Sequence, residues 1–152
     1  MDKLDINTHK SIFDAVKSCL PEGGVKDPTQ LAPLVLAYIG DTVFDLYVRT
    51  ELIISTDLTA HGLHVAAAKR VCAAAQAKGC KKIAGLLTDD EAAVFRRGRN
   101  AHMGTVPKNA SIADYRAATG VEAVIGWLYL KGEDERMGEL MRAMLEDDDE
   151  QI

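Results

Sequence analysis

Residues 34–49 read LVLAYIGDTVFDLYVR, the longest apolar run of the chain, and Asp41 stands in its middle. A second apolar run, GVEAVIGWLYL at residues 120–130, contains Glu122. Burying a carboxylate costs on the order of several kcal/mol unless a partner compensates its charge. A divalent cation shared by two carboxylates is one such partner, and it can also perform chemistry. Asp41 and Glu122 are therefore the first candidates for a functional site.

The composition is that of one globular domain. The chain has 152 residues, of which 47% are hydrophobic, and a domain of this length buries roughly 70% of its unfolded surface. No apolar run approaches the ~20 residues of a membrane span, and the first ten residues lack the apolar region of a signal peptide. The three cysteines show no C-x-x-C spacing, which indicates reduced thiols. We expect a soluble cytoplasmic protein with no membrane partner.

The net charge of −5 is unevenly distributed along the chain. Residues 133–150 hold nine acidic side chains against two basic ones, whereas residues 69–108 hold nine basic side chains against three acidic ones. A solvated helix face explains such a basic segment about as often as a binding surface does. Charge alone therefore does not identify a partner.

The sequence pattern predicts an all-α protein, because period-two alternation is absent and alanine and leucine are abundant. Glycine, proline and capping residues set the expected helix ends. In the first two thirds of the chain we expect helices from Thr8 to Leu20 and from about Leu31 to Ile54. A third begins at Asp57 or Thr59 and ends near Lys78, with Gly79 after its end. A capping box at Thr88–Glu91 opens a fourth.

In the last third, residues 100–110 are expected to form an irregular loop, and Ser111 to open the next helical element. A break is expected at Thr119–Gly120, and Gly132 closes the segment that holds Glu122. A last amphipathic helix carries Met137, Leu140, Met141, Met144 and Leu145. We expect one domain at residues 1–146 and an acidic, disordered tail at residues 147–152.

The predicted helix over residues 31–54 is apolar on nearly all sides. Such a helix is expected to be buried on most of its surface, either at the centre of a domain or at an interface.

Several polar residues can have either a structural or a functional role. Asp45 and Arg49 are four apart, so an ordinary helical ion pair explains them better than a site does. Glu122 can be a metal ligand or, since Thr119 precedes it by three residues, part of a capping box, and the spacing favours neither. His61 and His64 could contact one metal, but without a third ligand a solvated pair or a pair in the first turn of a helix is favoured.

Residues 36–49 resemble the signature helix of ribonuclease III catalytic domains. The likeness is greatest to the Mini-ribonuclease III branch, whose members consist of the catalytic domain alone. Further matches are AAQA at residues 74–77, RGRNA at 97–101 and TGVEAVIGWLYL at 119–130. The resemblance spans residues 31–145, nearly the whole chain.

The resemblance implies an all-helical fold and a homodimer that cleaves double-stranded RNA with Mg²⁺. Asp41 and Glu122 match the two metal-binding catalytic acids of the family. Further acids of full-length ribonuclease III would fall at Leu34, Ala37 and Thr119, which are not acidic here. This departure favours the Mini-ribonuclease III branch.

By the same resemblance, the expected function is maturation of precursor 23S ribosomal RNA, with a ribosomal protein or pre-ribosome as a further partner. Tyr38 and Asp45 are expected to support the metal ligands as their neighbours. RNA phosphates are expected to contact a group of polar residues after residue 95, namely Arg96, Arg97, Arg99, Asn100 and Lys108.

An alternative function is a non-catalytic helical module that docks on structured RNA or on a ribosomal assembly. Some ribonuclease III-like folds have lost their acids and work in that way. The presence of both Asp41 and Glu122 argues against this alternative.

Overall fold

The computed structural model describes residues 10–23, 26–101 and 111–147, and these residues form seven α-helices and one short 3₁₀ helix with no strand. The all-α prediction is therefore confirmed for the described part of the chain. The elements are α1 (Ile12–Ser18), η2 (Pro28–Gln30), α2 (Pro33–Ser55), α3 (Ala60–Val71), α4 (Ala73–Ile83), α5 (Asp89–Arg99), α6 (Ile112–Leu130) and α7 (Asp134–Leu145).

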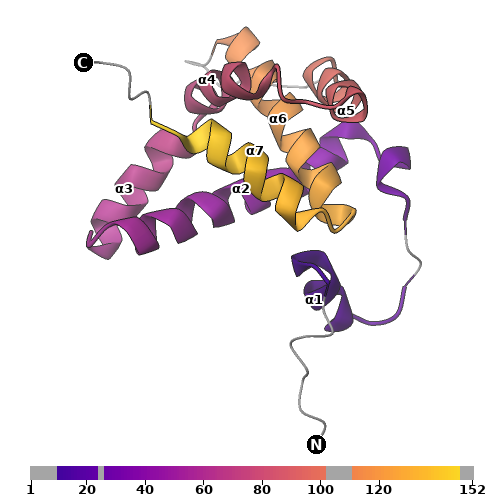
Figure 1. Ribbon diagram of the computed structural model, residues 1–152, viewed down its shortest axis with the longest axis horizontal. Coiled ribbons are helices and arrows are strands. Elements are labelled where there is room, and N and C mark those ends of the chain that lie inside the picture. The colour runs from indigo at the N-terminus through magenta and orange to yellow at the C-terminus, as the bar shows by residue number, and fades with distance from the viewer. Residues whose placement is uncertain (1–9, 24–25, 102–110, 148–152) are drawn as a thin grey trace, which may run out of the picture.

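Helix α6 is the centre of the molecule, and α2, α4, α5 and α7 pack around it (Figure 1). From Ala118 to Tyr129 every residue of α6 except Glu122 is buried. The most extensive packing is between α6 and α2, which cross each other in the middle of the fold. Glu122 is thus the one charged residue, and the one residue that is not buried, in this segment of α6.

The backbones of α2 and α6 touch at two glycines. A Cβ atom on Gly40 of α2 would overlap the carbonyl oxygen of Glu122 and would lie 2.9 Å from the backbone nitrogen of Gly126. A Cβ atom on Gly126 of α6 would in turn overlap the carbonyl oxygen of Leu36. Only glycine permits this approach, so the two residues fix how closely and in which register the helices cross.

Helix α5 is tied to α7 by an ion pair between the buried Glu91 and the partly exposed Arg136. The capping box predicted at Thr88 is confirmed, since Glu91 N donates to Thr88 Oγ1 and Thr88 N donates to Glu91 Oε1. The Glu91 carboxylate, 3% exposed, also accepts hydrogen bonds from Arg136 Nε at 2.9 Å and Nη2 at 2.8 Å. The Arg136 hydrogen bonds hold the pKa of Glu91 below its usual range.

The prediction of a single alanine-rich helix ending near Lys78 is wrong, because the structure has two helices in this segment, α3 and α4. Cys72 has extended backbone angles (φ −68°, ψ 158°) and separates α3 from α4. The break turns α4 onto α6 and α7. Gly79, expected beyond the helix end, lies inside α4, where the Met144 side chain would lie 3.2 Å from an added Cβ.

The break predicted at Thr119–Gly120 is also wrong, because α6 continues without interruption. The Thr119 hydroxyl donates to the Tyr115 carbonyl oxygen at 3.0 Å, so it satisfies a helix-interior bond rather than a cap. Gly120 makes room for Phe95 of α5, whose ring would lie 2.7 Å from an added Cβ. Glu122 is therefore not a capping residue.

The remaining helix predictions hold with small shifts. The first helix begins at Ile12 with Ser11 as its cap, whereas the predicted cap Thr8 lies outside the described residues. Ser111 caps α6, and Gly132, with φ 75°, follows it as expected. The tail after residue 147 and the loop at 102–110 lie outside the described residues, so the domain limits stay a prediction.

Helix α2 is buried on one face only. Leu36, Val43, Phe44 and Val48 enter the core, while the opposite face exposes large apolar side chains, among them Val35, Tyr38, Leu46 and Ile53. The expected burial on most sides is thus correct for the face toward α6 and incorrect for the outer face of the single chain. No helix among the described residues is both long and apolar enough to span a membrane.

We predict that Gly40→Ala and Gly126→Ala each destabilise the fold by about 3 kcal/mol or more, because the added methyl meets backbone that must move. Urea unfolding followed by circular dichroism measures this. Gly138→Ala in α7 is the matched control, since nothing lies within 4 Å of its added Cβ. The control should gain up to about 1 kcal/mol from helix propensity. Equal stability of all three variants would contradict a backbone contact between α2 and α6.

Candidate functional site

Asp41 and Glu122, 81 positions apart in the sequence, line the same pocket. Gly40 places α2 directly against the backbone of Glu122, and Asp41 is the next residue. The pocket has a volume of about 390 Å³. Residues from α2, from the junction of α3 and α4, and from α6 line it: Asp41, Val71, Ala73, Gln76, Tyr115, Ala118, Thr119 and Glu122.

Glu122 is the most perturbed acid in this pocket. Its pKa is raised from 4.5 to about 7, mainly by burial and in addition by the negative charge of Asp41. The Gln76 side-chain amide acts against both effects and lowers the pKa. Near neutral pH the Glu122 carboxyl therefore exchanges between its neutral and charged forms, and a positive charge in the pocket would favour the charged form.

Gln76 of α4 is almost completely buried, with 1% of its surface exposed. Its Nε2 atom is buried and has no hydrogen-bond partner with ordinary geometry. The amide nevertheless acts on Glu122 as a hydrogen-bond donor would. The pocket thus contains an amide N–H group that is directed at an acidic side chain and is not fully satisfied.

Asp41 is exposed, contrary to the expectation of a buried acid in an apolar run. It lies on the flank of α2 between the core face and the outer face, so its carboxylate reaches solvent at the pocket rim. The cost of burying a charge therefore applies to Glu122 and not to Asp41.

The expected supporting residues do not line this pocket. Tyr38 is 80% exposed on the outer face of α2. Asp45 forms the helical ion pair predicted from its spacing, with Arg49 Nε at 2.9 Å. A supporting role for either residue stays a prediction. His61 and His64 are exposed on α3, and the described residues contain no group of three or more His, Cys, Asp or Glu that could hold a metal.

The expected RNA contacts gather at the end of α5, where Arg96, Arg97, Arg99 and Asn100 are all exposed. Arg97 also has a structural role, because its guanidinium donates to the carbonyl oxygens of Thr29 at 3.3 Å and Leu31 at 3.1 Å. Arg99 donates to Asn100 Oδ1 at 3.3 Å. Lys108 lies outside the described residues.

Comparison with known proteins identifies the family. A model of the ribonuclease III domain matches residues 34–133, a range that contains the whole pocket. The chain belongs to the ribonuclease III family. As an endoribonuclease of this type, it is similar to the Mini-ribonuclease 3 of Clostridium tetani, with 46% identity over 79% of this chain and 80% of that protein. The Mini-ribonuclease 3 of a Thermoanaerobacter species is 45% identical over 73% of this chain and 78% of that protein.

The fold comparison agrees with the sequence comparison. A crystal structure of a Fusobacterium nucleatum protein matches with a TM-score of 0.70 and 26% sequence identity, over 77% of this chain and 93% of that one. The ribonuclease III assignment predicted from residues 36–49 and 119–130 is thus confirmed, and it extends to the Mini-ribonuclease 3 relatives.

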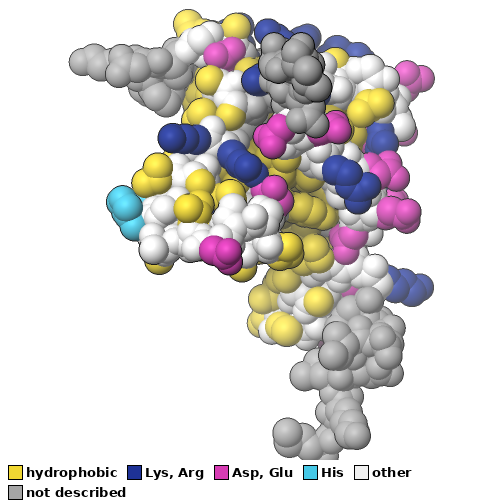
Figure 2. All heavy atoms as spheres, turned by 60° about the vertical axis from the view of Figure 1, so that its left-hand side comes forward, with side chains coloured by type: hydrophobic (Ala, Val, Ile, Leu, Met, Phe, Trp, Pro, Cys, Tyr) yellow, Lys and Arg dark blue, Asp and Glu magenta, His cyan; other side chains and the backbone are white. Residues whose placement is uncertain are grey.

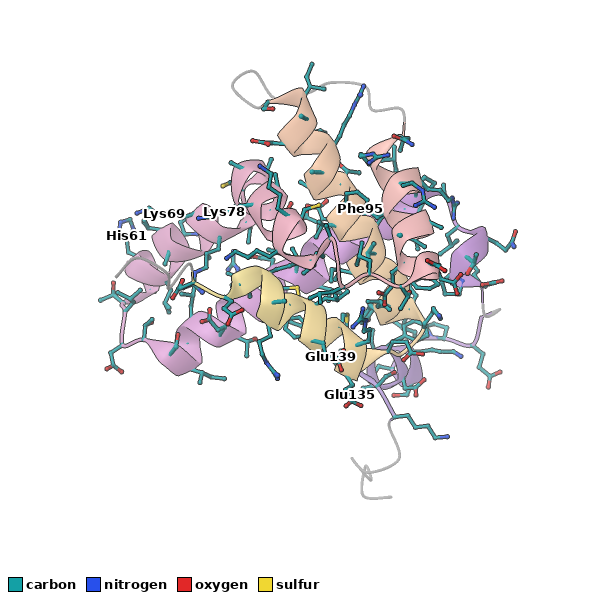
Figure 3. The ribbon with its side chains drawn as sticks, turned by 45° about the horizontal axis from the view of Figure 1, so that its top comes forward. His61, Lys69, Lys78, Phe95, Glu135 and Glu139 are labelled. Atoms are coloured by element: carbon teal, nitrogen blue, oxygen red, sulfur yellow. The ribbon has the colours of Figure 1, made fainter. Side chains whose placement is uncertain are left out.

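Sequence reasoning missed three polar residues of the pocket, Gln76, Tyr115 and Thr119. For Gln76 a signal was present, since it is a lone amide among alanines at residues 73–77. The basic segment of residues 69–108 was noted in the sequence, but not that four of its members, Lys69 and Arg70 of α3 and Lys78 and Lys82 of α4, line one pocket of about 150 Å³. Lys69 and Lys78 lie at the same end of the molecule (Figure 3).

We predict a pH dependence of stability that comes from Glu122. The pKa of Glu122 is about 7 in the folded protein against an ordinary value of 4.5, so between these values the folded state binds more protons than the unfolded state. Stability should therefore fall as pH rises through this interval. From about pH 5 to about pH 8, with a chelator present, the wild type should lose on the order of 2 kcal/mol relative to Glu122→Gln. Urea unfolding at both pH values measures it, and parallel profiles for the two proteins would be the contrary result.

Proposed function

We propose that this chain is a magnesium-dependent endoribonuclease that cleaves double-stranded RNA at the pocket of Asp41 and Glu122. The observation that carries the proposal is the meeting of these two acids from separate helices in one pocket, inside the matched ribonuclease III domain. Gly40 supports it, because the close helix crossing puts Asp41 next to Glu122.

The residues present suit a magnesium ion. Mg²⁺ prefers oxygen ligands, keeps several waters and is commonly held by one or two carboxylates together with substrate phosphates. Asp41 and Glu122 supply two carboxylates. Burial and, second to it, repulsion by Asp41 raise the pKa of Glu122, and a cation between the two carboxylates would offset both effects. The pocket of about 390 Å³ leaves room for waters and for a phosphate group.

Magnesium held there supplies Lewis acidity, which makes a water a better nucleophile and stabilises charge on the leaving oxygen of a phosphodiester. The protein's own residues orient these groups. Glu122, from the rigid and buried α6, sets one side of the site, and Asp41 sets the other side at the solvent-facing rim. Because Asp41 is exposed, an RNA backbone can reach the pair without opening the core.

Double-stranded RNA suits a protein that contacts backbone rather than bases, since side chains cannot read the narrow major groove of the A-form helix. Arg96 and Arg99 are exposed at the end of α5 and are the best placed of the predicted phosphate contacts. Arg97 is also exposed but is held by the carbonyl groups of Thr29 and Leu31. The proposed substrate is precursor 23S ribosomal RNA in a bacterial cytoplasm, with a ribosomal protein or pre-ribosome as a further partner, as the resemblance to the Mini-ribonuclease III branch implies.

We further propose that the enzyme is a homodimer built on the outer face of α2. Val35, Tyr38, Thr42, Leu46 and Ile53 follow helical spacing along this face, and the four large apolar side chains among them are exposed. Such a stripe on a single chain is typical of an interface. A hydrophobic band flanked by acidic and basic side chains is visible on one face of the molecule (Figure 2). A two-fold axis at such a stripe would join two identical sites in one enzyme.

We predict that Asp41→Asn and Glu122→Gln each lower cleavage of a long RNA duplex by at least about a hundredfold, because each removes a charge needed to hold Mg²⁺. Gel analysis of the duplex with and without Mg²⁺ measures this. Asp57→Asn is the matched control, since Asp57 is exposed and lies outside the pocket. Cleavage by Asp41→Asn at the wild-type rate would favour the non-catalytic docking module instead.

We predict that Leu46→Asp separates the dimer, because it places a charge in an apolar interface. Sedimentation at micromolar concentration should give about twice 16.5 kDa for the wild type and about 16.5 kDa for the variant. Leu86→Asp is the control, since Leu86 is 53% exposed and Leu46 51%, but Leu86 is not part of α2. A wild-type protein that stays monomeric would overturn the dimer proposal.

A further inference from the structure

Gln76 is a polar residue at a position that an apolar residue could occupy. Its neighbours on the buried side of α4 are Ala77, Gly79 and Ile83, and α4 packs against α6 and α7. A buried amide costs free energy unless both its oxygen and its nitrogen find partners. Gln76 Nε2 has none with ordinary geometry. An amide in such a place needs an explanation other than packing.

The pocket of Asp41 and Glu122 gives that explanation. Gln76 lines this pocket, is 1% exposed, and its amide acts on the Glu122 carboxylate. An amide nitrogen carries two N–H donors. One can hold a carboxylate oxygen of Glu122, and the second remains available to a water or phosphate oxygen in the pocket. Within the lining of this pocket, Gln76 is the only amide side chain.

We propose that Gln76 is a positioning residue, which holds the Glu122 carboxylate in the orientation that binds the metal. This inference rests on the proposed magnesium site. The Glu122 carboxylate stands at the end of a long side chain with several rotamers, whereas α6 itself is rigid and buried. A donor fixed on a different helix selects one of these rotamers. Partners of this kind commonly change metal affinity or activity by about 10–100-fold when they are removed.

The fold makes Gln76 available for this role. The break at Cys72 turns α4 away from α3 and starts a new helix, of which Gln76 is the fourth residue. A single continuous helix would carry the residues after 72 in a different direction. The separation of α3 from α4 thus brings a third element to the pocket, beside α2 and α6.

The test is the Mn²⁺ affinity of the RNA-free protein, measured by electron paramagnetic resonance, in the wild type and in Gln76→Leu. Leucine keeps most of the side-chain volume and removes the amide. We expect the affinity to fall about tenfold or more, while the midpoint of thermal unfolding without metal stays the same or rises, because a donor that is not fully satisfied has been removed. Ile83→Leu, a shape change at a buried α4 position outside the pocket, is the control and should leave the affinity unchanged.

A second background shows whether Gln76 acts through Glu122. In Glu122→Gln the residual Mn²⁺ affinity should not fall further when Gln76→Leu is added, since the carboxylate to be positioned is absent. If Gln76→Leu binds Mn²⁺ as the wild type does, while Asp41→Asn has lost binding, the positioning role is wrong and the metal site stands. If Asp41→Asn and Glu122→Gln both bind Mn²⁺ as the wild type does, the proposed metal site itself is wrong, and the role of Gln76 falls with it.

Discussion

The close crossing of α2 and α6 is the constraint on which the rest of the structure depends. Gly40 and Gly126 allow the two backbones to touch, because a Cβ on either residue would overlap a carbonyl oxygen of the facing helix. Glycine inside a helix costs about 1 kcal/mol relative to alanine. Both α2 and α6 contain such a glycine, and the close contact that the glycines allow fixes the distance and register between the helices that carry Asp41 and Glu122.

Helix α2 therefore has three surfaces with different roles. The inner face of α2 enters the core, its flank presents Asp41 at the rim of the pocket, and its outer face displays Val35, Tyr38, Leu46 and Ile53. Its central run is apolar nearly all round because two opposite faces need apolar side chains for different reasons. We propose that the outer face binds a second copy of the chain, so that dimerisation and the active site share a single rigid helix.

Much of the fold and part of the site could be predicted from the sequence. Local signals that act within a few residues were reliable, such as the Thr88–Glu91 capping box, Ser111 before α6 and Gly132 after it. Predictions failed where tertiary packing decides. Cys72 breaks a helix that the alanine-rich composition favours. Gly120 lies inside the continuous helix α6, and the side chain that it lacks leaves room for Phe95. The exposure of Asp41 and the burial of Gln76 depend on which elements face them, and no short-range pattern reports that.

The most direct test of the account is a double-mutant cycle between Asp41 and Glu122, measured as the free energy of unfolding with and without Mg²⁺. Without the ion, each of Asp41→Asn and Glu122→Gln should stabilise the fold, and the double variant should gain less than the sum, because both changes relieve one repulsion. With saturating Mg²⁺ only the wild type should gain substantial stability, so the coupling between the two positions should change sign. Additive effects in both conditions would contradict the claim that these two carboxylates form one cation site.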